Sequence, residues 1–390
     1  MKKQTVNLVT RSSQRAQSTQ RKIKYWPTLI ILCELRDLCV LRVIKFAMIL
    51  FLLVPLFSCL NNEPIQTQVS SVQVHASPEN DAIDIPDNYG FSHMQYIPGP
   101  LFTLSSNNAL PGEPVTVGMI ISEGGQTIRA ALFDSRDRRI ARTTFFPLED
   151  PGTGLLLKAA VLAVPSTALI GNATIKIEND DVVIGELPFS IGHREFYSET
   201  IALNQANTDL RTLPDPERTA QSNQLWVIIN TIGTEIYTTG PFIRPVTSTR
   251  RTSIYGARRI FQYTGGGTDT SIHAGVDYGV PTGTEVMASG RGRVVLARYR
   301  ILTGNSVILE HMPGVFTIYY HLDSLAVNEG QIVEAGQLLG LSGATGLATG
   351  PHLHWEVRVA GENADPDAFL ENPIIDKSDI LNKLISTTTD

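Results

Sequence analysis

Five side chains in the last third of the chain have the types and the spacing needed to hold a metal ion and to act beside it. They occur in three short fragments: HAGVD from His273 to Asp277, YYHL with His321, and HLHWE with His352 and His354. Imidazole nitrogens and carboxylate oxygens suit zinc, and a catalytic zinc typically keeps three protein ligands and one position for water. The five side chains therefore suffice for one metal centre and two further groups that act on a substrate.

The fragment that begins at His352 has the alternating pattern of a β-strand. Apolar residues at positions 353, 355, 357 and 359 alternate with His352, His354, Glu356 and Arg358. Side chains two positions apart in a strand point to the same face, so His352 and His354 share one face and Glu356 follows on it. Glu356 is open to two interpretations, a carboxylate that orients a metal-ligating histidine or a surface charge.

The first fragment also favours convergence on one ion. Gly275 permits a tight path between His273 and Asp277, so that both side chains can face the same point. The helical HExxH zinc motif is absent from the sequence, so the metal is expected on strands and loops. A histidine taken alone is more often structural, and we interpret His311, beside a turn, in this way.

Taken in order, the three fragments resemble the lysostaphin-type, or LytM-like, zinc endopeptidases of bacterial cell walls. The resemblance covers roughly residues 252–370, about a third of the chain. The surrounding segments match as well: RVV at 293–295, GN at 304–305 before VIL at 307–309, and GATG at 343–346 ahead of GPH at 350–352.

The resemblance implies a small antiparallel β-sheet core of the duplicated hybrid motif type, one zinc ion, and cleavage of peptide crosslinks in peptidoglycan. Carried over residue by residue, it implies His273, Asp277 and His354 as the metal ligands. It also implies His321 and His352 as the catalytic histidines, one taking the proton of a water and the other stabilising the oxyanion. The strand face that His352 shares with a ligand favours His352 as the base, although the sequence leaves this assignment open.

One residue departs from the family pattern. Tyr320 stands before His321, where a small residue is more usual. We expect this tyrosine to alter the substrate groove without removing activity.

The charge of the chain is uneven. Of its 32 Lys or Arg and 38 Asp or Glu, residues 1–58 hold ten basic and two acidic residues. The remainder therefore has 22 basic and 36 acidic residues, a net charge of −14. Phosphate binding needs a positive footprint, so we expect no nucleic acid partner.

Residues 1–59 have the pattern of a leader with a secretory or lipoprotein-type signal. Arg42 and Lys45 precede an apolar run at 46–57, which is shorter than a typical membrane span of about 20 residues. LFSC at 56–59 resembles a lipoprotein signal, in which the cysteine is lipidated after cleavage. We therefore expect export to the periplasm or cell envelope, with membrane attachment through Cys59. The sequence does not fix the translation start. It also leaves open the alternative that Cys59 is an incidental cysteine in an uncleaved membrane anchor.

The remaining chain divides by composition. Residues 60–90 read as a flexible tether, 193–245 as a helical linker with 225–229 buried, 246–372 as the LytM-like zinc peptidase domain, and 373–390 as a C-terminal tail. Residues 91–192 show about seven strand patterns separated by turns, which favours an immunoglobulin-like β-sandwich. These strands are expected at 101–105, 115–121, 129–134, 139–146, 155–164, 173–177 and 182–191.

Two other functional classes compete with a cell-wall endopeptidase. A non-catalytic LytM-like protein that binds wall or activates another hydrolase usually lacks some metal ligands, and this chain lacks none. A carrier domain is suggested by residues 327–340, which resemble a lipoyl or biotinyl hairpin, but the modifiable lysine is missing. The sequence leaves open which crosslink is cut and whether a regulatory protein partner acts.

Overall fold

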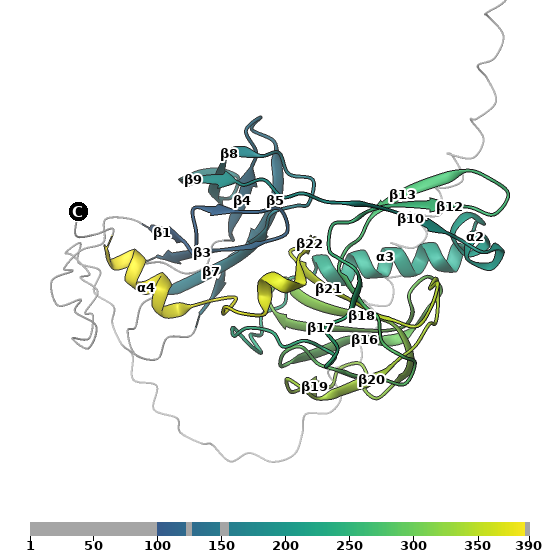
Figure 1. Ribbon diagram of the computed structural model, residues 1–390. Coiled ribbons are helices and arrows are strands. Elements are labelled where there is room, and N and C mark those ends of the chain that lie inside the picture. Colours follow the sequence, from purple (N-terminus) through teal and green to yellow (C-terminus); the bar gives the residue numbers. More distant parts are fainter. Residues whose placement is uncertain (1–99, 122–126, 149–155, 387–390) are drawn as a thin grey trace, which may run out of the picture. The chain divides into compact units, whose positions relative to one another are not determined.

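The computed structural model describes residues 100–121, 127–148 and 156–386, whose regular secondary structure is mostly β-strand (Figure 1). The signal pattern, Cys59 and the tether at 60–90 lie outside the described residues. Within the described ranges, no helix is long and apolar enough to cross a bilayer.

Two sheets form the first part of the described chain and share one apolar core. The first sheet has the order β1 (Leu101–Leu104), β3 (Pro114–Ile120), β7 (Leu157–Ala163) and β6 (Phe146–Pro147). The second has the order β2 (Asn108–Ala109), β9 (Val182–Ile191), β8 (Gly171–Asn179), β4 (Ile128–Phe133) and β5 (Arg139–Thr144). The predicted strand segments all contain strands, residues 139–146 are divided between β5 and β6, and β2 was not predicted. The immunoglobulin-like type of this sandwich stays a prediction.

Strand β7 is buried on both faces. Leu157, Ala159 and Val161 pack into a core shared with the C-terminal sheet, while Ala160 and Leu162 pack into the core between the first two sheets. A strand covered on both sides needs a nearly continuous apolar run, and residues 159–164 provide one. The sandwich and the C-terminal sheet therefore share buried surface along this strand.

The C-terminal sheet has ten strands in the described part of the chain, and its strand pairs are antiparallel. This agrees with the antiparallel sheet that the resemblance implied. The main order is β11 (Arg251–Ser253), β14 (Val276–Tyr278), β21 (Leu353–Val359), β18 (Val315–Leu325), β17 (Gly304–Met312), β16 (Gly292–Arg300) and β19 (Ile332–Val333). Beside this path lie β15 (Glu285–Met287), β20 (Leu338–Ser342) and β22 (Glu362–Ala364), followed by the short 3-10 helix η2 (Pro366–Phe369).

Between the sandwich and this sheet lie two helices, α2 (Gln205–Thr212) and α3 (Pro216–Asn230), and a strand that was not predicted. Asp215 caps α3 by accepting a hydrogen bond from the backbone N–H of Arg218 at 3.0 Å, and Pro216 occupies its first turn. The extra strand β10 (Ser198–Ala202) pairs in parallel with β12 (Arg258–Gln262), which pairs with β13 (Thr268–Ile272).

The segment at 225–229 is buried only on one side of α3. Leu225, Ile228 and Ile229 pack against the C-terminal sheet. Trp226 and Val227 are 57% and 67% exposed, so the prediction that the whole segment is buried is wrong at these two positions. Successive helical residues turn by about 100°, which directs 226 and 227 away from the face formed by 225, 228 and 229.

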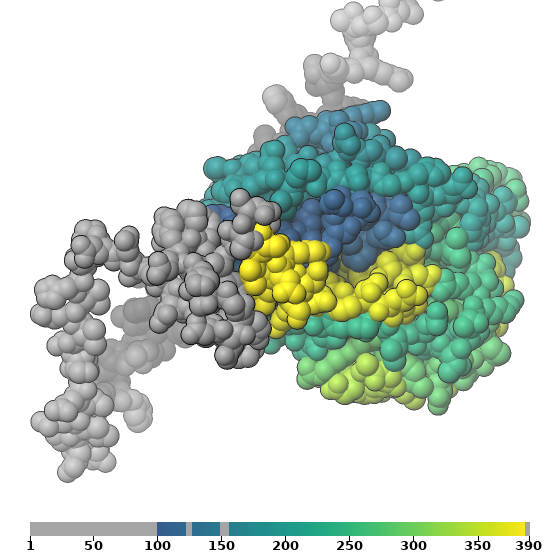
Figure 2. Space-filling model, turned by 60° about the vertical axis from the view of Figure 1, so that its left-hand side comes forward, coloured from purple at the N-terminus to yellow at the C-terminus, as the bar shows by residue number. Residues whose placement is uncertain are grey.

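The tail predicted at 373–390 contains a third helix, α4 (Lys377–Ser386), which packs against β1 and β3 (Figure 2). A Cβ atom on Gly118 of β3 would lie 2.3 Å from Cγ2 of Ile380, so only glycine permits this close packing. Lys383 donates to the carbonyl of Ser105 at 2.7 Å, and the hydroxyl of Thr116 donates to the carbonyl of Ile374 at 2.7 Å. Helix α4 therefore lies against the first strands of the sandwich.

A chain of buried hydrogen bonds crosses the interior of the C-terminal sheet. His311 has no exposed surface, and its Nδ1 donates to the carbonyl of Arg291 at 2.8 Å. Its Nε2 lies 2.7 Å from the hydroxyl of Thr317, which lies 2.9 Å from the hydroxyl of Tyr319. Burial lowers the pKa of His311 to about 4, because a charged imidazole would lose its hydration there.

This buried histidine predicts a pH-dependent stability. Because the folded pKa lies below the unfolded value of 6.5, the unfolded state binds the proton first as the pH falls from 6.5 to 4. His311 should withdraw about 3 kcal/mol of stability across that window. As the pH is lowered from 6.5 to 4, the urea midpoint of the chelator-treated protein should decrease. We expect this decrease to be smaller in His311→Asn than in the wild type. The exposed His193→Asn is the control, and equal slopes in all three proteins would contradict the role of His311.

Candidate metal centre

Three neighbouring strands bring the central side chains of the site together. In the pairing of β14 with β21, Asp277 lies opposite His354, and in the pairing of β21 with β18, His354 lies opposite Tyr320. His273 reaches the same place from the connection between β13 and β14. Gly275 makes this possible, since a Cβ there would lie 2.1 Å from the carbonyl oxygen of Trp355.

The three side chains expected as ligands present one atom each to a common point. His273 Nε2 lies 3.0 Å from His354 Nδ1 and 3.1 Å from Asp277 Oδ1, and the last two atoms are 2.7 Å apart. A zinc tetrahedron with bonds of about 2.0–2.1 Å has edges of about 3.3 Å. The donor atoms would need to move apart by only a few tenths of an ångström, so this His–Asp–His group fits a zinc ion.

The far side of His354 is held by a buried ion pair. Its Nε2 donates to Glu356 at 2.9 Å, and Glu356 accepts two hydrogen bonds from Arg358 at 2.8 and 2.7 Å. Glu356 is 4% exposed, which resolves the open interpretation in favour of a carboxylate that orients His354. Burial would raise the pKa of Glu356, but Arg358 and His354 lower it to about 2.

The electrostatics of His354 follow from its two carboxylate neighbours. Burial alone would lower its pKa, whereas the hydrogen bonds and charges of Asp277 and Glu356 raise the pKa to about 9. Asp277 is also buried, which would raise its pKa, but the hydrogen bond and the positive charge of His354 hold that pKa well below its usual range. Without a metal, the proton is therefore held on His354 between two ionised carboxylates.

A second set of supporting residues was not predicted from the sequence. Asp277 Oδ2 accepts from Arg259 Nη2 at 2.5 Å, and Arg259 Nε donates to Glu199 at 2.5 Å. Glu199 also accepts from the hydroxyl of Ser253 at 2.8 Å. His273 Nδ1 donates to the carbonyl of Ile254 at 2.8 Å, which leaves Nε2 as the nitrogen that can bind metal. Glu199 lies on β10 and Arg259 on β12, so their pairing depends on the unpredicted parallel strand.

The two histidines expected to act on the substrate lie beside the ligands in matching orientations. Nδ1 of His321 is 2.8 Å from the carbonyl of Thr345, and Nδ1 of His352 is 2.8 Å from the carbonyl of Gly350. In each neutral ring, the Nδ1–H group donates a hydrogen bond to the carbonyl, so Nε2 is the unprotonated nitrogen. The two ring centres are 4.7 Å apart, and His352 Nε2 lies 3.9 Å from Asp277 Oδ1.

His321 and His352 differ in backbone strain and in burial. His321 has a φ of 62°, which is rare for a non-glycine residue and typical of functional positions. Burial, and then the positive charges of His352 and His354 when protonated, lower the pKa of His321 to about 3. The side chain of His352 is 16% exposed, more than that of Asp277 or His354 at 8%.

Tyr320 lies beneath the ligands. Its side chain is buried, and its ring is parallel to that of His354, with an interplanar angle of 8° and 5.5 Å between ring centres. Tyr320 thus contacts an expected ligand directly, and its effect on the substrate groove stays a prediction.

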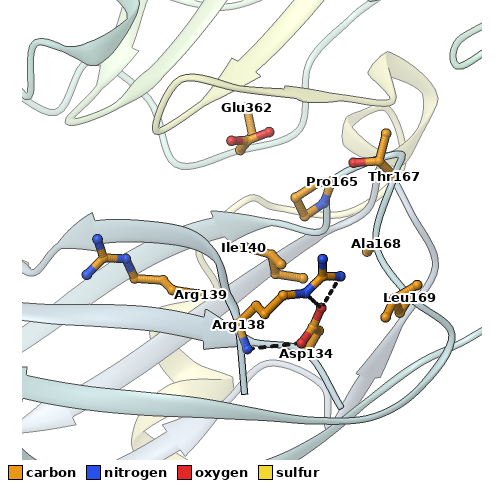
Figure 3. Close-up of a pocket in the computed structure, with 9 residues that line it drawn as sticks. All are labelled: Asp134, Arg138, Arg139, Ile140, Pro165, Thr167, Ala168, Leu169 and Glu362. Atoms are coloured by element: carbon orange, nitrogen blue, oxygen red, sulfur yellow. Dashed lines mark hydrogen bonds and ion pairs between the residues drawn. The ribbon is translucent and has the colours of Figure 1, made fainter. Parts of the chain in front are cut away.

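A cavity of about 460 Å³ opens elsewhere, between the sandwich and the turn before β22 (Figure 3). Its main charged pair is Asp134 with Arg138, 2.7 Å apart, and Glu362 lies on its far wall. None of the five candidate residues lines it. The candidate metal centre is thus separate from this cavity.

Comparison with known proteins agrees with this geometry. Residues 271–366 match the model of Peptidase family M23. Peptidoglycan DD-endopeptidase ShyB of Vibrio cholerae is 43% identical over 93 residues, covering 24% of this chain and 22% of that protein. Peptidoglycan DD-endopeptidase ShyA of the same organism is 47% identical over 89 residues, covering 23% and 21%. The similar segment thus spans less than a quarter of the length of these two relatives.

Among solved structures, the catalytic domain of the antimicrobial peptidase lysostaphin from Staphylococcus simulans is 32% identical. The match covers 32% of this chain and 89% of that domain, with a TM-score of 0.24. The family match contains all five candidate side chains. Residues 271–366 are therefore a peptidase family M23 domain.

Proposed function

We propose that this protein is a zinc-dependent endopeptidase that hydrolyses peptide crosslinks of bacterial peptidoglycan. The observation that carries the proposal is the convergence of His273 Nε2, Asp277 Oδ1 and His354 Nδ1 beside two further histidines. The similarity to proteins named peptidoglycan DD-endopeptidases supports the substrate class and makes a DD crosslink the first to test.

The donor set suits zinc, because two neutral imidazoles and one carboxylate leave room for a fourth ligand. A zinc ion held by His273, Asp277 and His354 would supply a water of lowered pKa and would polarise the scissile carbonyl. Glu356 and Arg259 keep the ligands oriented through their hydrogen bonds to His354 and Asp277.

His352 is the general base in this proposal. Its Nε2 is unprotonated when Nδ1 donates to the carbonyl of Gly350, and its side chain is 16% exposed, so this nitrogen can accept the proton of the attacking water. The same proton can then pass to the leaving amine. His321 is more deeply buried, and its unprotonated Nε2 can accept a hydrogen bond from the water and so orient it. It can donate to an oxyanion only after it gains a second proton.

Activity and metal content of variants test these roles. The wild type should release new amino groups from purified sacculi, and a chelator should abolish the release. His352→Ala and His321→Ala should retain zinc but lose about 10²–10⁴-fold in rate, as expected for acid–base groups. His273→Ala should lose both zinc and activity.

Each contrary result has a defined meaning. Equal release with and without chelator would favour a non-catalytic protein that binds wall or activates another hydrolase. Zinc lost from either His321→Ala or His352→Ala would make that histidine a ligand and would overturn the assigned roles. His193→Ala, at an exposed position, is the control for nonspecific effects.

The proton on His354 predicts how zinc affinity depends on pH. Since the pKa of metal-free His354 is raised to about 9, zinc must displace a proton at neutral pH. Affinity should fall by about tenfold for each unit of decrease between pH 8 and pH 6, as measured by competition with a chromogenic chelator. Glu356→Gln removes a negative charge that raises the pKa of His354. In this variant the dependence of zinc affinity on pH should therefore become weaker near pH 8. A zinc affinity that does not change with pH would rule out proton displacement.

We further propose that the protein acts in the cell envelope and is anchored by lipid on Cys59. The signal pattern at 46–59 and the location of peptidoglycan outside the cytoplasmic membrane support this. Cys59→Ala should move the protein out of the membrane fraction and abolish its labelling by a fatty-acid probe. Unchanged fractionation and labelling would reject the anchor.

A further inference from the structure

Arg300, at the end of β16, is a buried cation with no acidic partner. It is 5% exposed, and among the described residues no carboxylate is within ion-pair distance of its guanidinium. Its Nε has no hydrogen-bond partner within the described part of the protein. Burying an unpaired charge is costly, so a sequence that retains such a group usually uses it.

The guanidinium joins three segments of the protein. Nη1 donates to the hydroxyl of Thr303 at 3.2 Å and to the hydroxyl of Tyr320 at 3.4 Å. Nη2 donates to the backbone carbonyl of Gln221, in α3, at 3.1 Å. The side chain of Gln221 accepts in turn from the backbone N–H of Ile301 at 2.8 Å. Arg300 therefore connects helix α3 to Tyr320.

Tyr320 carries this connection to the metal centre. Its ring stacks on His354, whose Nδ1 faces the other two expected ligands and whose Nε2 is held by Glu356. The two ring nitrogens fix the imidazole within its own plane, and the tyrosine limits the tilt of that plane. The orientation of His354 is thus restrained by groups on both β21 and β18.

Helix α3 lies on the same face of the sheet as the ligands. Leu225, Ile228 and Ile229 pack against an apolar cluster that continues along β18 to Tyr320. Tyr320 is the member of that cluster that lies opposite His354 in the strand register. The packing of α3 against the sheet therefore affects the position of Tyr320.

We propose that Arg300 and Tyr320 are positioning residues that couple helix α3 to His354. The packing of α3 on the sheet then determines the affinity of the centre for its metal. The inference rests on the proposed function in one respect, namely that His354 is a ligand.

Zinc affinity and the geometry of the centre test the coupling. The variants are Tyr320→Ala, which removes the stacking ring, Tyr320→Phe, which removes only the hydroxyl, and Arg300→Met, which removes the link to α3. Ile308→Val is the matched control, because Ile308 belongs to the same cluster but lies on β17, away from His354. For each protein, the zinc dissociation constant, the visible spectrum of the cobalt-substituted form and the unfolding midpoint with chelator are measured.

We expect Tyr320→Ala and Arg300→Met to weaken zinc binding by about 10–100-fold and to shift the cobalt bands. Tyr320→Phe should weaken binding less, because the ring stays in place, and it guards against a poorly folded alanine variant. Ile308→Val should lower the unfolding midpoint while leaving affinity and spectrum unchanged.

Folded variants at 320 and 300 whose zinc affinity stays within twofold of the wild type, with an unchanged spectrum, would overturn the inference and make both residues packing residues. Wild-type protein that holds no zinc would overturn it as well, together with the proposed function. Weakened zinc binding in these variants, found with a wild type that binds zinc but cleaves no crosslink, would support the coupling and reject only the activity.

Discussion

The carboxylate of Asp277 is the group on which the site depends. It is nearly fully buried, and it contacts His273, His354 and Arg259 through its two oxygens. A buried carboxylate is tolerated only when every lone pair is used and opposite charge is near. The surrounding charges form a continuous series across the sheet, in which Glu199, Arg259 and Asp277 precede His354, Glu356 and Arg358.

This series is balanced before any metal binds. Three carboxylates face two guanidiniums and one imidazolium, since the pKa of His354 is raised to about 9. A dication in place of that single proton leaves one positive charge in excess. Such an excess suits the negative charge that develops on a carbonyl oxygen during attack. The charge balance therefore links metal binding to a proton and to the chemistry proposed for the site.

How much the sequence predicted depended on whether the determining contacts were local. The alternation at 352–359 placed His354 and Glu356 on one face, and the structure shows them hydrogen-bonded. Gly275 was identified from a four-residue spacing, and the backbone of Trp355 does approach it closely. These predictions succeeded because strand periodicity and turn geometry are properties of a few consecutive residues.

The residues that were missed depend on distant pairing. Glu199 supports Arg259 only because β10 joins β12 in parallel, and no local pattern indicates a parallel partner about 60 residues away. The sequence around Arg300 looks like that of an ordinary strand end. Its burial under α3 is a result of tertiary packing, which the local sequence does not indicate. The exposure of Trp226 was missed for a different reason, because an apolar run in a short helix was taken as buried all round.

The arrangement also explains why the two catalytic candidates have different surroundings. Helix α3 covers the sheet face on the Tyr320 side of His354, whereas His352 lies just before β21 and retains 16% exposure. In the proposed reaction, a substrate would therefore reach the centre from the side of His352. The side chain closest to solvent can accept a proton and release it, while the buried, backbone-strained His321 is better suited to hold a fixed orientation. The roles proposed for the two rings thus depend on the position of α3 as much as on the rings themselves.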